Sequence, residues 1–520
     1  MLAIRAWLVC LGAAGLLAAT LVGAEAASRV DSKAAAATLT AGLAEPLDCA
    51  VPTFDDKCEE FATVFDNEGS GGWNFINDME ISPSGDRAYF TGTSIGNLFD
   101  TVVAVYDTAT AAPVTTIRWD AGTTNENPHA SEISPDGKTL YVTGAVIGRR
   151  SETISNVVYG YYDYGTVAFD VETGQEQWSS FYEAPGLGLG AARASALSSD
   201  GDLLYVAGES PAPGSGLGNE ARDFVTIAYT AEDEDHPEGI GQELWVSRFD
   251  GSRFDQVTDA VLSPDDRRLY VTGLANNDGI TIAYDALTGE GLWAKRLSVG
   301  NRTFNGKILV SPDGRRVFVS GMRNEVGPGD GSALASVTAY DAASGSELWS
   351  DVTAAAVPNN PALRTGSWAH AVGMSRDGAT VFHAGVSTVA SSARENDLYV
   401  VALDAATGSR RWAKNHLAPG SSEQAWGLTT DPSGEQLFVV GYSSYPGQSC
   451  DALTLAYATD DGEQLWAARY PWLRQPVRPC STGREVAVVG DAGRLVVAGQ
   501  ISDLTNNQNP FNFGVLGYDI

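Results

Sequence analysis

The chain has 520 residues and a formal net charge of −32, with 65 acidic and 33 basic side chains. A charge of this sign disfavours binding to nucleic acid or to an anionic membrane surface, because both repel an acidic protein. The length alone would suggest about three or four domains, but the internal repeats described below place most of the chain in one.

The first 48 residues are expected to lie outside the folded domain. Residues 1–26 have the features of a secretory signal peptide: Arg5 supplies the positive charge, an apolar run follows, and Ala24-Glu-Ala26 is a cleavage site of small residues. Residues 27–48 are rich in alanine and are interpreted as a linker. No other run is long enough to span a bilayer. These features predict a secreted or extracytoplasmic protein without membrane insertion.

The remainder of the chain repeats one unit of four strand-like segments. In each unit, the first strand ends at a turn such as Ser134-Pro-Asp-Gly137, in which proline presets φ and glycine accepts a positive φ. An apolar strand ending in glycine, a third strand and a strand with an aromatic residue follow. The turns start at Ser82, Ser134, Ser198, Ser263, Ser311, Ser375, Asp431 and Gly490. The aromatic residues are Trp119, Trp178, Trp245, Trp293, Trp349, Trp412 and Trp466.

A four-stranded unit with this period is typical of a propeller blade. The eighth copy lacks its fourth strand, and residues 60–66 match the fourth-strand pattern of residues 244–250. We therefore predict an all-β, eight-bladed β-propeller over residues 49–520. Its blades have four strands, and the strand at residues 59–66 completes the last blade and closes the ring. Seven blades with an additional hairpin is the alternative.

Four cysteines follow the signal segment, which suits an oxidising compartment. The blade assignment places Cys450 and Cys480 on the same face of adjacent blades, whereas Cys49 and Cys58 flank the 59–66 strand. Of the pairings that are formally available, this arrangement favours the disulfides Cys49–Cys58 and Cys450–Cys480.

One face of the propeller is expected to bind. Long unrepeated segments, such as 145–163 and 209–223, fall between second and third strands, on the face where each inner strand starts. The inner strands start five residues before each turn, at Asn77, His129, Arg193, Thr258, Gly306, His370, Trp426 and Glu485, with Asp78, Asp259 and Lys307 beside them. These positions line the opening of the central channel, which we call the axial mouth.

The candidate ligand-binding residues at the axial mouth come from blades two to seven. They are His129, Arg193, Asp259, Lys307, His370 and Trp426. They form either a ligand pocket on the axis or hydrogen bonds between neighbouring blades. In a pocket, the arginine and the lysine would suit a carboxylate or sugar-acid ligand.

A repeated aspartate precedes the third-strand aromatic residue by six positions, at Asp100, Asp163, Asp223, Asp278, Asp397 and Asp451. Catalytic groups rarely repeat six times in one ring, so we predict an Asx cap that ties this strand to its neighbour. The sequence contains no HExxH motif, zinc-type cysteine spacing or P-loop. No metal site, cofactor or catalytic residue is predicted.

The fourth-strand motif, AYDALTGEGLW at 283–293 and ALDAATGSRRW at 402–412, resembles the tryptophan-docking repeat of quinoprotein (pyrroloquinoline quinone, PQQ) dehydrogenases. Non-catalytic propellers such as the outer-membrane assembly lipoprotein share it, and the SPDG half resembles surface-layer and lactonase-like propellers. The resemblance implies the propeller architecture. For a quinoprotein it would also imply PQQ with calcium, but the adjacent cysteines of those enzymes are absent from this sequence.

These features together predict a monomeric, secreted binding or scaffold propeller that uses its loop-rich face and axial mouth. The expected partner is a protein, a glycan or a small ligand. The first alternative is a PQQ-dependent dehydrogenase, and a lactonase or lyase is a further alternative.

Overall fold

A computed structural model describes residues 61–65, 74–95, 99–122, 125–154, 157–215, 221–232, 239–251, 253–298, 303–323, 334–353, 364–389, 396–416, 421–444, 450–470, 481–489, 493–501 and 512–520. The chain divides into two units, Met1–Thr38 and Leu39–Ile520, and every described residue belongs to the second. The signal segment, the linker, Cys49, Cys58 and Cys480 lie outside the described residues. Both disulfides therefore stay predictions.

The described residues are all-β, as predicted, and their strands form eight four-stranded units that we call blades one to eight. Blades one and two contain β2 (Asn74–Ile81), β3 (Arg87–Ile95), β4 (Phe99–Asp107), β5 (Pro113–Trp119), β6 (Asn125–Ile133), β7 (Thr139–Ile154), β8 (Val157–Asp170) and β9 (Glu176–Tyr182). Blades three and four contain β10 (Ala191–Leu197), β11 (Leu203–Pro211), β12 (Arg222–Thr230), β13 (Glu243–Phe249), β14 (Asp255–Leu262), β15 (Arg268–Ala275), β16 (Asp278–Asp285) and β17 (Gly291–Leu297).

Blades five and six contain β18 (Thr303–Val310), β19 (Arg316–Arg323), β20 (Leu334–Asp341), β21 (Glu347–Thr353), β22 (Arg364–Met374), β23 (Thr380–Val389), β24 (Asn396–Asp404) and β25 (Arg410–His416). Blade seven contains β26 (Ser422–Thr430), β27 (Gln436–Ser444), β28 (Cys450–Ala458) and β29 (Gln464–Tyr470). Blade eight contains β30 (Ser481–Val489), β31 (Arg494–Ile501), β32 (Asn512–Asp519) and β1 (Phe61–Phe65).

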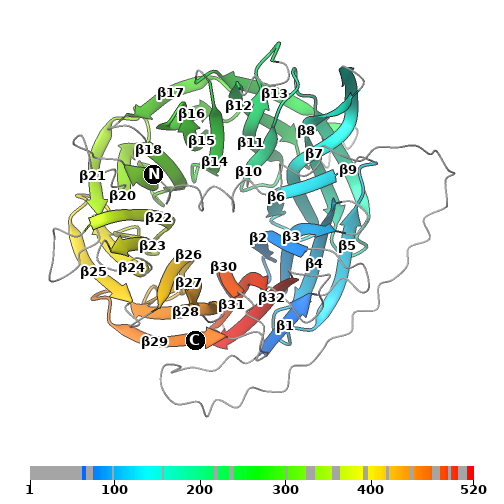
Figure 1. Ribbon diagram of the computed structural model, residues 1–520. Coiled ribbons are helices and arrows are strands. Elements are labelled where there is room, and N and C mark those ends of the chain that lie inside the picture. The colour runs from blue at the N-terminus through cyan, green and yellow to red at the C-terminus, as the bar shows by residue number, and fades with distance from the viewer. Residues whose placement is uncertain are drawn as a thin grey trace. The chain divides into compact units, whose positions relative to one another are not determined.

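Each blade is an antiparallel meander, and the first strand of each blade lies innermost (Figure 1). A parallel bridge between Phe99 and Asn125 joins blades one and two into one eight-stranded sheet. Every inner strand contacts the inner strands of the two neighbouring blades, and β2 contacts both β6 and β30. The starts of the inner strands therefore come together around one axis.

The hydrophobic core lies between neighbouring blades rather than at one centre. Phe382 and Val400 of blade six, for example, pack with Val439 and Leu453 of blade seven, and all four are fully or almost fully buried. The third strands are near-continuous apolar runs because both of their faces are covered by adjacent blades.

The N-terminal strand pairs with the last blade, as the sequence predicts. β1 runs antiparallel to β32, with Phe61 opposite Gly517 and Phe65 opposite Phe513. Blades one and eight also share a hydrophobic cluster, and the Arg494 Nη1 atom donates to the Thr108 carbonyl oxygen at 2.9 Å. That β1 closes the ring remains a prediction.

The fourth-strand tryptophans dock onto the following blade. The Trp245 Nε1 atom donates to the Ala286 carbonyl oxygen at 3.0 Å, and the indole covers Gly289, which has a φ of +71°. A Cβ at Gly289 would lie 2.5 Å from the indole, so glycine serves both the positive φ and the close approach. The same arrangement recurs for Trp293 on Gly345, Trp349 on Gly408 and Trp412 on Gly462.

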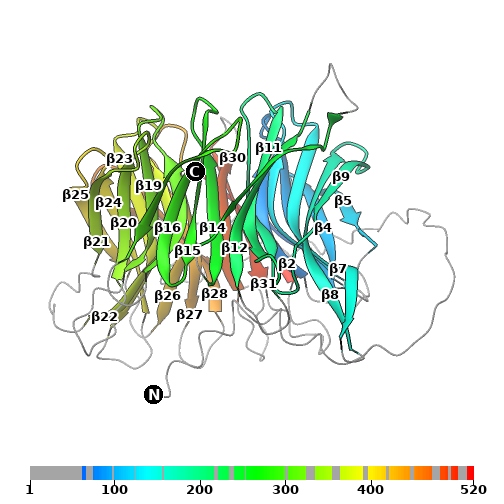
Figure 2. The same cartoon turned by 90° about the horizontal axis from the view of Figure 1, so that it is seen from above.

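Two local expectations are corrected. The segment 145–163 is mostly a long antiparallel hairpin rather than an irregular loop: β7 and β8 pair outward as far as Ile154 and Val157, beyond the ends of the neighbouring strands (Figure 2). Its β-branched and aromatic residues favour strands. At three of its six positions the repeated aspartate is an ion-pair partner rather than the expected Asx cap. Asp163 binds Arg150, Asp223 binds Arg248 and Asp278 binds Arg296.

Candidate functional site

Each inner strand carries a β-bulge near its start. The residues left out of the pairing are Asn77, His129, Arg193, Thr258, Gly306 with Lys307, His370, Trp426 and Arg484. The residue before each bulge is buried, whereas the bulged residue is partly or fully exposed. A bulge re-aims a side chain out of the regular alternation of a strand. Eight bulges, one from each blade, therefore surround the axial mouth.

The bulges coincide with the predicted starts of the inner strands in seven blades. In blade eight the spacing from the turn pointed to Glu485, but the bulged residue is Arg484. The turn of this blade, Gly490-Asp-Ala-Gly493, has neither the serine nor the proline of the SPDG pattern, and its count is shifted by one position.

The six predicted site residues form three pairs, each between consecutive blades. The first pair is His129 and Arg193, whose Nε2 and Nη1 atoms are 3.2 Å apart. The Arg193 Nη2 atom also binds the Glu209 Oε1 atom at 2.7 Å, and Glu209 is fully buried. Burial and the nearby Arg193 charge hold the pKa of His129 well below its ordinary value. His129 is therefore neutral at physiological pH.

The second pair is Asp259 and Lys307, with 3.9 Å between the Oδ1 and Nζ atoms. The other Asp259 oxygen, Oδ2, accepts from the Ile308 amide at 2.9 Å. The negative charge of Asp259 raises the pKa of Lys307, and burial raises the pKa of Asp259. Lys307 therefore remains charged while it is held by acids on other blades.

Further acids surround Lys307, and we call Asp78, Glu80, Glu132, Asp259 and Glu485 the axial acid cluster. Burial raises the pKa of Glu132 to about 8, and the Asp78 charge adds to this shift. Burial also raises the pKa of Glu485 to about 7, although the Lys307 charge opposes the shift. The cluster thus holds protonated and ionised carboxyl groups together near neutral pH.

Glu80 and Glu132 were missed by the sequence analysis. Both stand two residues before the turn serine, where other blades have apolar residues such as Ala196, Val261 and Leu309. An acid at a position that is apolar in the other repeats is the signal that would have found them.

The third pair is His370 and Trp426, whose rings stack with their centroids 4.5 Å apart and their planes 7° from parallel. The His370 Nδ1 atom lies 2.9 Å from the Ala425 carbonyl oxygen, and burial lowers the pKa of His370. Trp368 lies edge-on to His370 at 6.3 Å and is 41% exposed. We call Trp368, His370 and Trp426 the aromatic group.

The electrostatics of the axial mouth do not support the expected carboxylate ligand. Arg193 is bound to Glu209, and Lys307 is attracted by Asp259, Glu485 and Asp78. The positive charges of Arg193 and Lys307 are thus offset by neighbouring carboxylates, and acids outnumber cations around Lys307. PQQ carries three carboxylates of its own, so these residues do not fit it.

The comparisons with known proteins agree with this architecture. Residues 235–497, just over half of the chain, match the family model described as outer membrane protein assembly factor BamB. The chain belongs to this family. Its membership confirms the predicted PQQ-like repeat.

Solved structures show the propeller fold at low sequence identity. The C-terminal WD40 domain of Sif2 has a TM-score of 0.51 at 9% identity, over 86% of this chain and 96% of that chain. The Dos1 propeller has a TM-score of 0.50 at 11% identity, over 86% and 95%. The quinohemoprotein alcohol dehydrogenase from Comamonas testosteroni has a TM-score of 0.48 at 11% identity, over 88% and 78%.

No curated protein matches the chain. The described residues include no helix that is long and apolar enough to cross a membrane.

Proposed function

We propose that this protein is a secreted binding propeller whose axial mouth takes a neutral, hydroxyl-rich ligand such as the end of a glycan. The observation that carries the proposal is the aromatic group beside the axial acid cluster, in which Trp368 is exposed and His370 and Trp426 are partly buried. A flat aromatic surface packs against the apolar face of a sugar ring, while convergent polar groups bind its hydroxyls.

Blade eight places one residue beside the aromatic group and the next residue in the axial acid cluster. The Arg484 guanidinium lies 5.7 Å from the ring centre of Trp426, and the next residue, Glu485, belongs to the axial acid cluster. Carboxyl groups with raised pKa values suit hydroxyls, because a protonated carboxyl donates one hydrogen bond and accepts others. The compensated cations offer little to an anionic ligand.

A glycan array with the purified chain, followed by calorimetry with the bound sugars, tests the proposal. Replacing Trp368 with alanine is expected to weaken sugar binding about fivefold, since one aromatic contact contributes about 1 kcal/mol. The melting temperature should hardly change, because Trp368 is exposed. Leu287→Ala, at a side chain that is 74% exposed in the β16–β17 turn, is the control and should leave binding unchanged. An array without any bound glycan would count against the proposal.

Protein binding is the second candidate, and the family description as an assembly factor favours it. A scaffold would act through its surface rather than through the axial mouth. Capture of a partner that is unaffected by Trp368→Ala would favour this function over sugar binding. The dehydrogenase alternative predicts dye reduction after addition of PQQ and calcium. The lactonase or lyase alternative predicts turnover of a lactone or an acidic sugar without either.

A further inference from the structure

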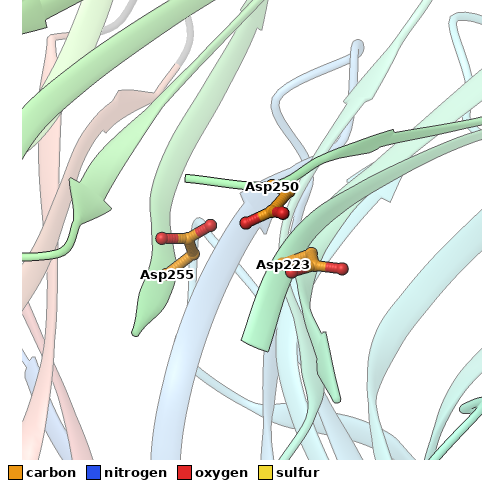
Figure 3. A group of neighbouring side chains, drawn as sticks. All are labelled: Asp223, Asp250 and Asp255. Carbon is orange, nitrogen blue, oxygen red and sulfur yellow. The ribbon is translucent and has the colours of Figure 1, made fainter. Parts of the chain in front are cut away.

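A second group of acids lies where blade three connects to blade four. Asp223 stands near the start of β12, Asp250 directly follows β13, and Asp255 begins β14 (Figure 3). One carboxylate oxygen from each residue lies within 4.8 Å of the other two. Three side chains that are separated in the sequence therefore converge at one connection between blades.

Asp255 is the informative member of this group. It is fully buried, and its Oδ2 atom accepts from the Gly251 amide at 2.6 Å. Its Oδ1 atom is buried and has no hydrogen-bond partner among the described residues. Figure 3 shows the Asp255 carboxyl group turned toward Asp250. Because a buried carboxylate oxygen without a partner is costly, this atom indicates a ligand between the three side chains.

Two arginines offset part of the negative charge of the three aspartates. The Arg248 Nη1 atom binds the Asp223 Oδ2 atom at 2.8 Å, and the Arg296 Nη2 atom binds the Gly251 carbonyl oxygen at 2.9 Å. A carboxylate has two oxygens, so Asp223 can hold an arginine through one oxygen and a metal ion through the other.

We propose that Asp223, Asp250 and Asp255 bind one Ca²⁺ ion that links blade three to blade four. An all-oxygen, carboxylate donor set suits a hard cation. Ca²⁺ accepts carboxylate oxygens in an irregular arrangement, whereas Mg²⁺ demands near-ideal octahedral geometry. Water and backbone oxygens would complete the coordination. In the sequence, Asp223 is one member of a structural repeat, and no metal site is predicted from it.

Calorimetry with the full chain, purified in the presence of a chelator and then dialysed, tests this site. Titration with CaCl₂ is expected to show one site with a dissociation constant of about 10⁻⁴–10⁻³ M, since Arg248 offsets part of the ligand charge. At 10 mM calcium, about ten times the upper value, the melting temperature should rise by about 1–3 °C. MgCl₂ should give a smaller response.

The decisive variant is Asp250→Asn, because Asp250 is the exposed member and its replacement leaves the buried residues in place. It should lower calcium affinity at least about tenfold and abolish the rise in melting temperature. Asp163→Asn is the matched control: Asp163 occupies the equivalent repeat position in blade two and pairs with Arg150. This control should respond to calcium like the unmodified chain.

Three outcomes would overturn the proposal. The first is no heat of binding and no thermal shift at 10 mM CaCl₂, about ten times the upper dissociation constant. The second is an equal calcium response in Asp250→Asn, which would place the ion elsewhere. The third is a calcium-insensitive chain that Asp255→Asn stabilises, which would show that Asp255 is a neutral buried acid.

Discussion

The inner and outer strands of the blades use the same repeat in opposite ways. At the outer edge, the same pair of side chains recurs, a tryptophan of one blade on a turn glycine of the next, as in Trp349 on Gly408. At the inner edge the same backbone feature recurs, a β-bulge, but the bulged residue differs in almost every blade. A repeated side chain therefore marks a structural contact, and a repeated backbone site with varied side chains marks a candidate binding site.

Removing a docking tryptophan should give the largest loss of stability. Trp412 is 8% exposed, and its Nε1 atom donates to the Thr459 carbonyl oxygen at 2.9 Å. Trp412→Ala is expected to lower the free energy of unfolding by about 3–5 kcal/mol, through lost burial and the cavity that remains. Denaturant unfolding measures this, with Leu465→Ala, at a 43% exposed side chain of the next blade, as the control. A loss no larger than that of the control would show that docking is not a main contributor.

The N-terminal strand offers the second test, because its pairing with the last blade is expected to close the ring. Val64 lies opposite Gly514 in the ladder between β1 and β32. Val64→Pro restricts the backbone and removes an amide donor, and should lower the free energy of unfolding by about 2–3 kcal/mol. Hydrogen exchange should then show lost protection in both blade eight and blade one. Loss confined to blade eight would mean that β1 completes a blade without closing the ring.

The inner edge itself contains both kinds of residue, and Arg193 shows the structural kind. Its partner Glu209 is fully buried, so Arg193→Ala leaves a buried carboxylate whose one remaining cationic partner among the described residues is Arg222, at 3.9 Å. The free energy of unfolding should fall by about 1–2 kcal/mol. Arg149→Ala, which breaks the exposed pair with Glu183, is the matched control and should cost less than about 0.5 kcal/mol. If both variants lose the same free energy of unfolding, Arg193 is not a structural residue and becomes a candidate for ligand binding again.

The sequence predicted the eight-bladed fold and the strand starts that surround the axis, but not the contacts of the candidate site. Turn spacing and the fourth-strand pattern identify the blades and the pairing of β1 with the last blade, because both depend on local backbone preferences. The same spacing locates the bulges, except where the degenerate turn at Gly490 shifts the count. The spacing does not predict that Glu209 forms an ion pair with Arg193. That pair depends on the direction in which the bulge turns the Arg193 side chain, toward the second strand of the same blade.

The sequence also did not predict which acids come together in the folded chain. Glu132 and Glu485 belong to strands that are far apart in the chain, and they come together only because the inner strands share an axis. Similarly, Asp223 looks like any other repeated aspartate until Asp250 and Asp255 are placed beside it. Repeats report what the blades have in common, whereas a site depends on the residues by which they differ.

The last expected effect concerns the pH dependence of the axial acid cluster. Glu132 has a folded pKa of about 8 against an ordinary value of 4.5, so between these pH values the folded chain holds a proton that the unfolded chain releases. The contribution of Glu132 to stability therefore falls as the pH rises from about 4.5 to about 8. The groups that face it are Asp78, Glu80, Asp259 and the Ser195 hydroxyl, which donates to Oε1 at 3.1 Å.

Glu132→Gln removes this titration and keeps an oxygen that can accept from Ser195. The variant should melt at a higher temperature than the unmodified chain at pH 8, and the difference should shrink toward pH 5. Asp265→Asn is the control: its partner, the Ser263 hydroxyl, lowers the pKa of this exposed turn carboxyl, so its contribution is lost only in acid. Thermal melts across this pH range measure both variants. A constant difference for Glu132→Gln would mean that Glu132 is already ionised at pH 5, and that the axial mouth carries more negative charge than a binding site for neutral sugars should.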